Sequence, residues 1–302
     1  MSGSPNDNRD GLGPRALERI AERSGYIVKA RWVPSTDSTQ RLAKELAGVS
    51  GVPDGRADVS AGEAVGGPAP GKAYLVAADE QTAGVGRRGN LWHSPQGAGL
   101  WFSLVLSSAR PRSEWPVLTS LVALAARDGV NRWAPGEAGL KWPNDLYARG
   151  RKLAGVLAEA LAGSGGLIVL GLGINVAQSR DDFPPDLRGR AISVAELAGR
   201  SVDRMALLAA ILASLADRWA AFERGGPGTL RPVLHEASLL MGRRVVIGPT
   251  EEAPPGDTRQ VHAGRVVGLG PVGELRIRDD DGAAHTIASG YVLRVDPPLE
   301  EG

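Results

Sequence analysis

The sequence predicts an α+β protein in which a mixed helix-and-strand domain is followed by a small all-β domain. Helical and strand-like hydrophobic patterns alternate between residues 14 and 237, which is typical of helices packed on a mixed sheet. From residue 238 the pattern changes to short alternating runs separated by Gly, Pro or Asp-Gly turns. We therefore expect domains at 14–237 and 238–296, with tails at 1–13 and 297–302.

Composition limits the classes of function. The 35 Lys and Arg balance 34 Asp and Glu to a net charge of +1, so no broad cationic field is expected and any anion site must be local. The chain contains no cysteine, which excludes disulfides, a thiol nucleophile and a thiolate metal site. We find no secretion signal and no run of about 18 apolar residues, and expect a soluble cytoplasmic protein.

The expected elements of the first domain follow from hydrophobic spacing and capping residues. Residues 1–13 and 48–72 lack regular apolar spacing and are interpreted as a disordered tail and a flexible insertion. The expected elements are a helix at 14–25, a strand at 26–33, a helix capped by Asp37 or Ser38, strands at 73–78 and 100–106, a helix capped by Ser113, strands near 139–142, 153–161 and 167–176, and helices capped by Ser193 and Asp203. Short strands are expected at 244–247, 262–267, 274–278, 285–288 and 291–295.

The Gly-rich segment at 84–89 (GVGRRG) follows an expected strand and could bind an anion. Its backbone amides can converge on a phosphate or carboxylate, and Arg87 and Arg88 add positive charge. It lacks the Lys-Ser/Thr ending of a Walker loop and the glycine spacing of a dinucleotide fingerprint. A solvated hairpin turn would give the same pattern.

Three further segments carry candidate ligand-binding residues. Residues 141–145 (KWPND) bring charged and amide side chains to a strand end, although short polar turns share this composition. Lys152 enters an apolar strand, where a buried ammonium needs a partner unless it reaches water at an edge. The glycines of 171–175 (GLGIN) would let a flat ligand approach the backbone or would mark a β-bulge. Trp92 and His93 could cover a ring or simply pack.

Five segments together resemble the biotin protein ligases, in order and in approximate spacing. They are STDSTQ (35–40), DEQTAGVGRRGN (79–90), KWPND (141–145), RKLAGVL (151–157) and GLGIN (171–175). The resemblance covers residues 14–296. It implies a catalytic domain related to class II aminoacyl-tRNA synthetases, followed by an SH3-like β-barrel domain.

The resemblance implies a role for individual residues. Biotin would be bound by Ser38, Thr39, Gln81, Gly84, Arg87, Lys152 and Gly155. ATP and the adenylate would be bound by Arg87, Arg88, Trp92, Lys141, Asn144, Lys152 and Asn175. The catalytic set would be Arg87, Lys141, Lys152 and Asp145, with Asp145 as a base, a Mg²⁺ ligand or a brace for the loop.

The resemblance also implies the reaction and the partners. Biotin and ATP would form biotinyl-5′-AMP with release of pyrophosphate, with the help of Mg²⁺. Biotin would then pass to a lysine of the biotin carboxyl carrier domain of a carboxylase. The Gly-Arg loop would be disordered without ligand and would order over the intermediate. A lipoate or octanoate ligase or transferase of the same fold is the alternative.

The sequence departs from the family pattern at two points. Val85 and Asn90 stand where members commonly carry Arg, which removes any cationic role at these positions. About thirty residues with one expected helix precede the catalytic start, too few for the helix-turn-helix domain that some members have. We therefore expect a short form that binds neither DNA nor membranes and acts as a monomer or homodimer.

Overall fold

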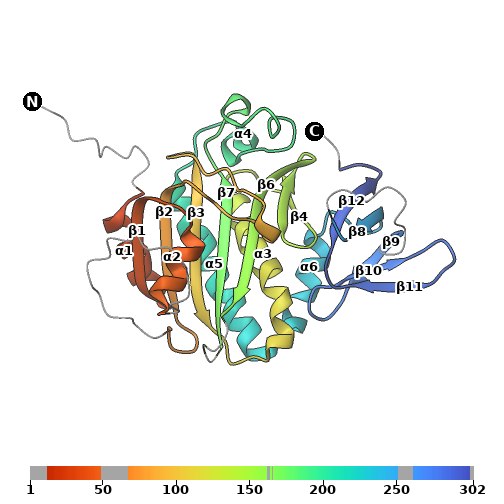
Figure 1. The fold of residues 1–302 in the computed structure, drawn as a ribbon, viewed down its shortest axis with the longest axis horizontal. Helices are drawn as coiled ribbons and strands as arrows, with labels where there is room; N and C mark the ends of the chain where they lie inside the picture. The colour runs from red at the N-terminus through yellow and green to blue at the C-terminus, as the bar shows by residue number, and fades with distance from the viewer. Residues whose placement is uncertain (1–11, 49–66, 162–163, 165, 251–260, 300–302) are drawn as a thin grey trace, which may run out of the picture.

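The computed structural model describes residues 12–48, 67–161, 164, 166–250 and 261–299. They form a seven-stranded sheet with helices and a separate five-stranded sheet (Figure 1). The helices are α1 (Pro14–Ser24), α2 (Thr39–Leu46), α3 (Leu118–Val130), α4 (Val194–Ala198), α5 (Arg204–Gly225) and α6 (Arg231–Ala237). The strands are β1 (Ile27–Thr36), β2 (Ala73–Gln81), β3 (Gly99–Ser107), β4 (Ala138–Lys141), β5 (Asp145–Ala148), β6 (Arg151–Ala160), β7 (Leu167–Asn175), β8 (Arg244–Gly248), β9 (His262–Leu269), β10 (Leu275–Arg278), β11 (Ala284–Ile287) and β12 (Tyr291–Asp296).

The larger sheet is mixed, as the sequence predicts. Its strand order is β1-β2-β3-β7-β6-β5-β4, with β1 and β2 parallel and all other neighbours antiparallel. The register places Gly155 of β6 opposite Gly173 of β7, and Gly171 of β7 opposite Ser103 of β3. Three glycines therefore lie close together near the middle of the sheet.

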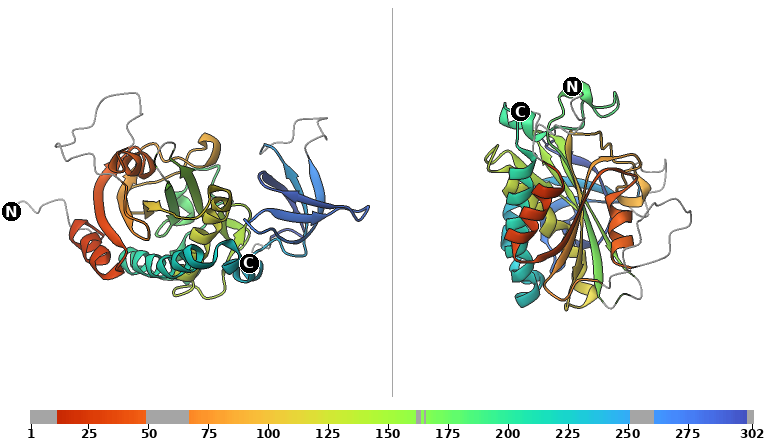
Figure 2. Two further views of the ribbon diagram at one scale, coloured as in Figure 1. Left: turned by 90° about the horizontal axis from the view of Figure 1, so that it is seen from below. Right: turned by 90° about the vertical axis from the view of Figure 1, so that its left-hand side faces the viewer.

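Helices cover both faces of this sheet. One face carries α1, α3 and α5, and the other carries α2 (Figure 2). Every residue of β3 is buried, because a central strand covered on both faces must be apolar on both sides. The larger core lies under α3 and α5, and a smaller core joins Ala43 of α2 to Val76 and Val169 of the sheet.

Helix α5 supplies much of the larger core. Asp203 caps it as predicted, since its carboxylate accepts hydrogen bonds from the backbone N–H groups of Met205 and Ala206. By length and composition α5 is the one helix among the described residues that could cross a membrane. Here Leu207 and Ile211 are fully buried, and α3 packs along the helix. Its apolar stripe is thus used inside the domain.

The five-stranded sheet, ordered β11-β10-β9-β8-β12, packs against the end of the larger sheet. Val245 and Ile277 of this sheet are fully buried in the same apolar core as α3 and α5. Trp142, which follows β4, donates its indole N–H to the carbonyl of Gly273 at 2.9 Å. The two sheets are therefore joined by shared apolar packing and by a buried polar contact.

Some expected elements differ from those observed. Ser113 does not cap α3, because residues 112–117 form a 3₁₀ turn containing Pro116 and the α-helix begins only at Leu118. Strand β5 and helix α6 were not expected from the sequence. Leu12, assigned to the N-terminal tail, is buried in the core. The rest of that tail, most of the 48–72 insertion and residues 300–302 lie outside the described residues.

Candidate active site

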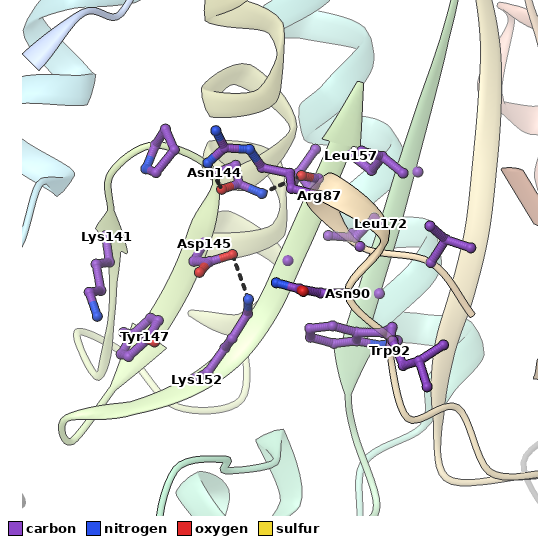
Figure 3. A pocket seen from close by; sticks show the side chains of 18 of the residues that line it. Arg87, Asn90, Trp92, Lys141, Asn144, Asp145, Tyr147, Lys152, Leu157 and Leu172 are labelled. Carbon is purple, nitrogen blue, oxygen red and sulfur yellow. Dashed lines mark hydrogen bonds and ion pairs between the residues drawn. The ribbon is translucent and has the colours of Figure 1, made fainter. Parts of the chain in front are cut away.

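A cavity of about 500 Å³ extends from α2 across the middle of the larger sheet to the β4–β5 turn and the start of β12. Its walls come from α2, the loop after β2, the β4–β5 turn, strands β6 and β7, and the start of β12. Figure 3 shows the part lined by Arg87, Asp145 and Lys152. The cavity therefore brings together side chains from all five segments that carry the family resemblance. One end is uncharged and polar, and the other is cationic.

The polar end is a network of buried amides and hydroxyls. The backbone N–H and the hydroxyl of Thr39 both donate to Gln81 Oε1, at 2.8 and 3.0 Å. The same hydroxyl lies 2.9 Å from Ser103 Oγ, which in turn donates to Gln40 Oε1 at 3.1 Å. Ser38 is also buried here. Such a pre-oriented set can bind the uncharged polar end of a ligand, because each group is already held in place.

Glycines form the floor of the cavity. A Cβ atom at Gly173 would lie 2.4 Å from Trp92 Nε1, and one at Gly171 would lie 2.6 Å from Gln40 Oε1. Across from Gly173, a Cβ at Gly155 would meet Trp92 at 3.1 Å. Strand β7 pairs in unbroken register with both neighbours, so no β-bulge is present at these glycines. They allow the indole of Trp92 to approach the backbone.

The cationic end contains four positive side chains and one carboxylate. Arg87, Lys141, Lys152 and Arg190 line it together with Asp145. Lys152 Nζ lies 2.9 Å from Asp145 Oδ1 and 5.3 Å from the centre of the Trp92 ring. Lys152 thus has a partner inside the cavity, as expected for a lysine entering an apolar strand. The excess of positive charge makes this end a site for an anion of more than one charge.

Burial makes the charged form of two of these cations less favourable. Burial lowers the pKa of Lys141, with a further contribution from neighbouring cations, while the Asp145 carboxylate acts in the opposite direction. Burial likewise lowers the pKa of Arg87, and Asp145 again opposes the shift. The negative charge of one carboxylate is therefore too small to balance the positive charges of the partly desolvated cations around it. A bound anion would complete the compensation.

Asn144 fixes the position of Arg87. Its side-chain N–H donates to the carbonyl of Val156 at 2.6 Å, and the N–H of Val156 donates back to the Asn144 carbonyl at 3.0 Å. The remaining amide oxygen accepts a hydrogen bond from Arg87 Nη1 at 3.2 Å (Figure 3). The β4–β5 turn thereby holds the guanidinium at the cavity wall.

Three of the expected site residues do not line the main cavity. Gly84 lies at the base of the loop, where a Cβ would come within 2.6 Å of the Trp92 carbonyl. Arg88 turns away to the ring of Tyr291 in the five-stranded sheet. Asn175 donates to the Ile192 carbonyl at 3.1 Å and lines an adjoining cavity of about 240 Å³. Trp92 and Lys152 line both cavities.

Other lining residues were not singled out from the sequence. Ser103 carried a signal, because it interrupts the apolar run of β3 with a hydroxyl. Arg190 and Tyr291 lie in segments without a recognisable motif, and only the fold brings them to the cavity. Within the Gly-Arg loop, Val85 forms a β-bridge with Leu91. The disorder of this loop without ligand stays a prediction.

Comparison with known proteins agrees with this geometry. Residues 32–175 match the model of the "Biotin/lipoate A/B protein ligase family". This segment, just under half of the chain, is therefore similar to the biotin/lipoate A/B protein ligase family. The matched segment contains the polar end, the Gly-Arg loop, the β4–β5 turn and the glycine floor.

Curated relatives of this family are similar over part of their length. The bifunctional ligase/repressor BirA of Bacillus spizizenii is 36% identical over 184 residues, which is 60% of this chain and 51% of that protein. The biotin--[acetyl-CoA-carboxylase] ligase of Mycobacterium tuberculosis is 35% identical over 57% of this chain and 63% of that protein. The chain therefore spans about half to two thirds of the length of these relatives.

Solved structures agree over a larger part of the chain. The biotin protein ligase from Aquifex aeolicus in complex with biotin and ATP has a TM-score of 0.66 and 27% identity, and covers 87% of this chain and 97% of its own. The Leishmania major biotin protein ligase in complex with biotinyl-5-AMP, at 22% identity and a TM-score of 0.53, shares the fold.

Proposed function

We propose that this chain is an ATP-dependent biotin protein ligase. It would convert biotin and ATP to biotinyl-5′-AMP and pyrophosphate, and then transfer biotin to a lysine of the biotin carboxyl carrier domain of a carboxylase. The observation that carries the proposal is the single cavity with an uncharged polar end and a cationic end, joined by a glycine floor. Substrates with an uncharged polar head and an anionic tail match this arrangement, and the Aquifex relative was solved with biotin and ATP.

The polar end would bind the ureido group of biotin. A ureido group has one carbonyl acceptor and two N–H donors, and Ser38, Thr39 and Gln81 bring hydroxyls and an amide to this end of the cavity. The fused rings would lie against the backbone at Gly155. This orientation directs the aliphatic chain and its carboxylate toward Arg87 and Lys152 at the other end of the cavity.

Activation requires two anions to meet. The biotin carboxylate attacks the α-phosphate of ATP, a new O–P bond forms, and pyrophosphate leaves. Two unit charges 4 Å apart repel by about 4 kcal/mol at an effective dielectric constant of 20. Arg87, Lys152 and Lys141 would neutralise the approaching groups and the charge that develops on the phosphate. Trp92 and Asn175 would border the nucleotide.

Mg²⁺ would be held mainly by the phosphates. Among the described residues, no cluster of three or more His, Cys, Asp or Glu could hold a metal ion, and Asp145 is the carboxylate that lines the cavity. One carboxylate together with substrate phosphates is a common arrangement for Mg²⁺. When bound, Mg²⁺ would supply charge neutralisation on the leaving pyrophosphate.

Transfer requires a neutral amine. The acceptor lysine attacks the acyl carbonyl of the adenylate, the C–O bond to AMP breaks, and the amine gives up a proton. Asp145, now 2.9 Å from Lys152 Nζ, would accept that proton once Lys152 turns to the phosphate. The variant Asp145→Asn separates the roles: a base affects only transfer, whereas a metal ligand affects activation as well.

Several finer features belong to the same proposal. The catalytic domain would be related to class II aminoacyl-tRNA synthetases, and the five-stranded sheet would be an SH3-like barrel. The reaction would take place in the cytoplasm, without binding to DNA or membranes, in a monomer or homodimer. The Mycobacterium relative, named for acetyl-CoA carboxylase, supports a carboxylase carrier domain as the acceptor.

The test is biotin-dependent exchange of labelled pyrophosphate into ATP. Exchange that requires biotin and falls at least a hundredfold in both Arg87→Ala and Lys152→Ala would support adenylation in this cavity. A matched control is Arg276→Ala on the exposed face of β10, which should exchange like the wild type. Exchange with octanoate or lipoate but not with biotin would instead identify the alternative reaction of the family.

A further inference from the structure

The Gly-Arg loop contacts the five-stranded sheet through two consecutive arginines. The Arg88 guanidinium lies 4.6 Å from the centre of the Tyr291 ring, and it also donates to the carbonyl of Pro249. Arg87 lies 6.0 Å from the same ring and donates to Ser289 Oγ at 3.4 Å. One tyrosine at the start of β12 therefore faces both arginines. Cations over an aromatic face are attracted by the negative potential of the ring.

The backbone of Arg88 adopts a conformation that needs support from surrounding contacts. Its φ of 55° and ψ of 28° lie in the left-handed region, which is unfavourable for a residue with a Cβ. Among the described residues, Arg149 is the other non-glycine residue with positive φ. A strained conformation persists where surrounding contacts compensate for it. The side chain of Arg88 contacts Tyr291 at the start of β12 and Pro249 just after β8.

Tyr291 is a firm support for the loop. It pairs with Gly248 across β12 and β8, and it is half-buried. The residue before it, Gly290, has no space for a side chain, because a Cβ would lie 2.7 Å from Ile247 Cγ2. The loop also has internal hydrogen bonds, from the N–H of Gly86 to the carbonyl of Asn90 at 2.7 Å and from the N–H of Asn90 to the carbonyl of Arg87 at 3.2 Å. Tyr291 is thus held by strand pairing that does not depend on the loop.

We propose that Tyr291 is a positioning residue that seats Arg88 and so holds the Gly-Arg loop over the cavity, with Arg87 directed inward. Tyr291 also lines the cavity. The five-stranded sheet would then take part in the reaction by keeping the loop closed over the adenylate and excluding water. The expectation that Arg87 contacts the substrates depends on the proposed function. The contact between Arg88 and Tyr291 does not depend on it.

The seating can be tested by trypsin, which cleaves after Arg87 and Arg88 only when the loop opens. The full-length chain is digested briefly without ligand, and cleavage at each site is followed by mass spectrometry. Tyr291→Leu should speed cleavage in the loop about two- to fivefold, the range expected for a partly exposed cation–π contact. Tyr291→Phe keeps the ring and should match the wild type. The control Val267→Ala, at an exposed position on β9, should also match it.

Three results would overturn the proposal. One is equal loop cleavage in Tyr291→Leu and the wild type. Another is faster cleavage at Arg278 of β10 to the same extent as in the loop, since that would mean loosening of the whole sheet. If Tyr291→Phe speeds loop cleavage as much as Tyr291→Leu does, the aromatic ring is not what holds Arg88.

A second readout addresses catalysis. If Tyr291 keeps the loop closed, Tyr291→Leu should release more AMP for each biotin transferred, because the exposed adenylate hydrolyses. If Tyr291 had only a structural role, Tyr291→Leu would lower the AMP released and the biotin transferred in the same proportion. The digestion needs no substrate, so a wild-type chain that fails to adenylate biotin would refute the proposed function and leave the seating intact. If the wild-type chain is an active ligase but Tyr291→Leu is digested at the wild-type rate, the proposed function stands and the role of Tyr291 is refuted.

Discussion

The glycine floor makes a sharp prediction for Gly173→Ala. The added methyl would lie 2.4 Å from Trp92 Nε1 and 2.7 Å from Trp92 Cε2, where ordinary contacts begin at 3.4 Å. The indole must therefore move by about 1 Å, because the β7 backbone is fixed between two paired strands. Gly155 lies on the other strand beneath the same ring, so the ring has to move away from the sheet and into the cavity.

The size of the effect follows from overpacking. Adding a methyl to a tightly packed position costs about 1–3 kcal/mol. If the displaced ring occupies ligand space, the whole cost appears on binding, as a loss of affinity of about 5- to 150-fold. The contact of Lys152 with the Trp92 ring, now 5.3 Å to its centre, would be disturbed as well. We therefore expect weaker binding of both biotin and ATP.

Isothermal titration calorimetry measures this loss directly. Gly268→Ala on β9 is the matched control, since a Cβ there meets nothing within 4 Å, and it should bind biotin as the wild type does. Trp92→Phe should partly restore binding to Gly173→Ala, because a smaller ring leaves space for the methyl. Wild-type affinity in Gly173→Ala, or strict additivity of the two substitutions, would refute the explanation.

Three other substitutions test the rest of the site and the fold. Asn144→Ala removes the acceptor that holds Arg87, so pyrophosphate exchange should slow roughly tenfold or more; an unchanged rate would contradict this role. Arg204→Ala leaves the buried Asp79 carboxylate unpaired and should lower the free energy of unfolding by about 3–5 kcal/mol, measured by denaturant titration; a loss below 1 kcal/mol would exclude a stabilising pair. Burial lowers the pKa of Lys141, so the unfolded chain holds this proton more tightly. Its contribution to the free energy of unfolding should rise as the pH increases from the lowered pKa toward 10.5, and pH-dependent unfolding should show that slope reduced in Lys141→Met.

Hydrophobic spacing was sufficient to predict most of the fold. The apolar runs of β2, β3 and β7 and the helical stripe of α5 are long enough for their period to be read directly. Strand β5 was missed because its four residues show no period and follow a polar turn. Ser113 was a plausible cap, but residues 112–117 form a 3₁₀ turn and the α-helix begins at Leu118.

The site could be predicted only where it is built from local motifs. Arg87, Lys141, Asn144 and Lys152 do line one cavity, as their segments predicted. The pairing of Gly155 with Gly173 depends on strand register, which sequence spacing does not determine. The position of Tyr291 beside the cavity could not be predicted from the sequence, for a different reason. Its place depends on how one sheet packs against another, and the short alternating run around it resembles any edge strand.

The wall that β12 adds to the cavity also has a consequence for protein synthesis. Residues 290–293 are translated more than a hundred residues after β7 completes the larger sheet. A nascent chain can therefore fold its first domain on the ribosome while the cavity still lacks one side. Ligands that need that side would bind only after the last strands have left the exit tunnel, so the chain would gain full affinity for them late in its own production.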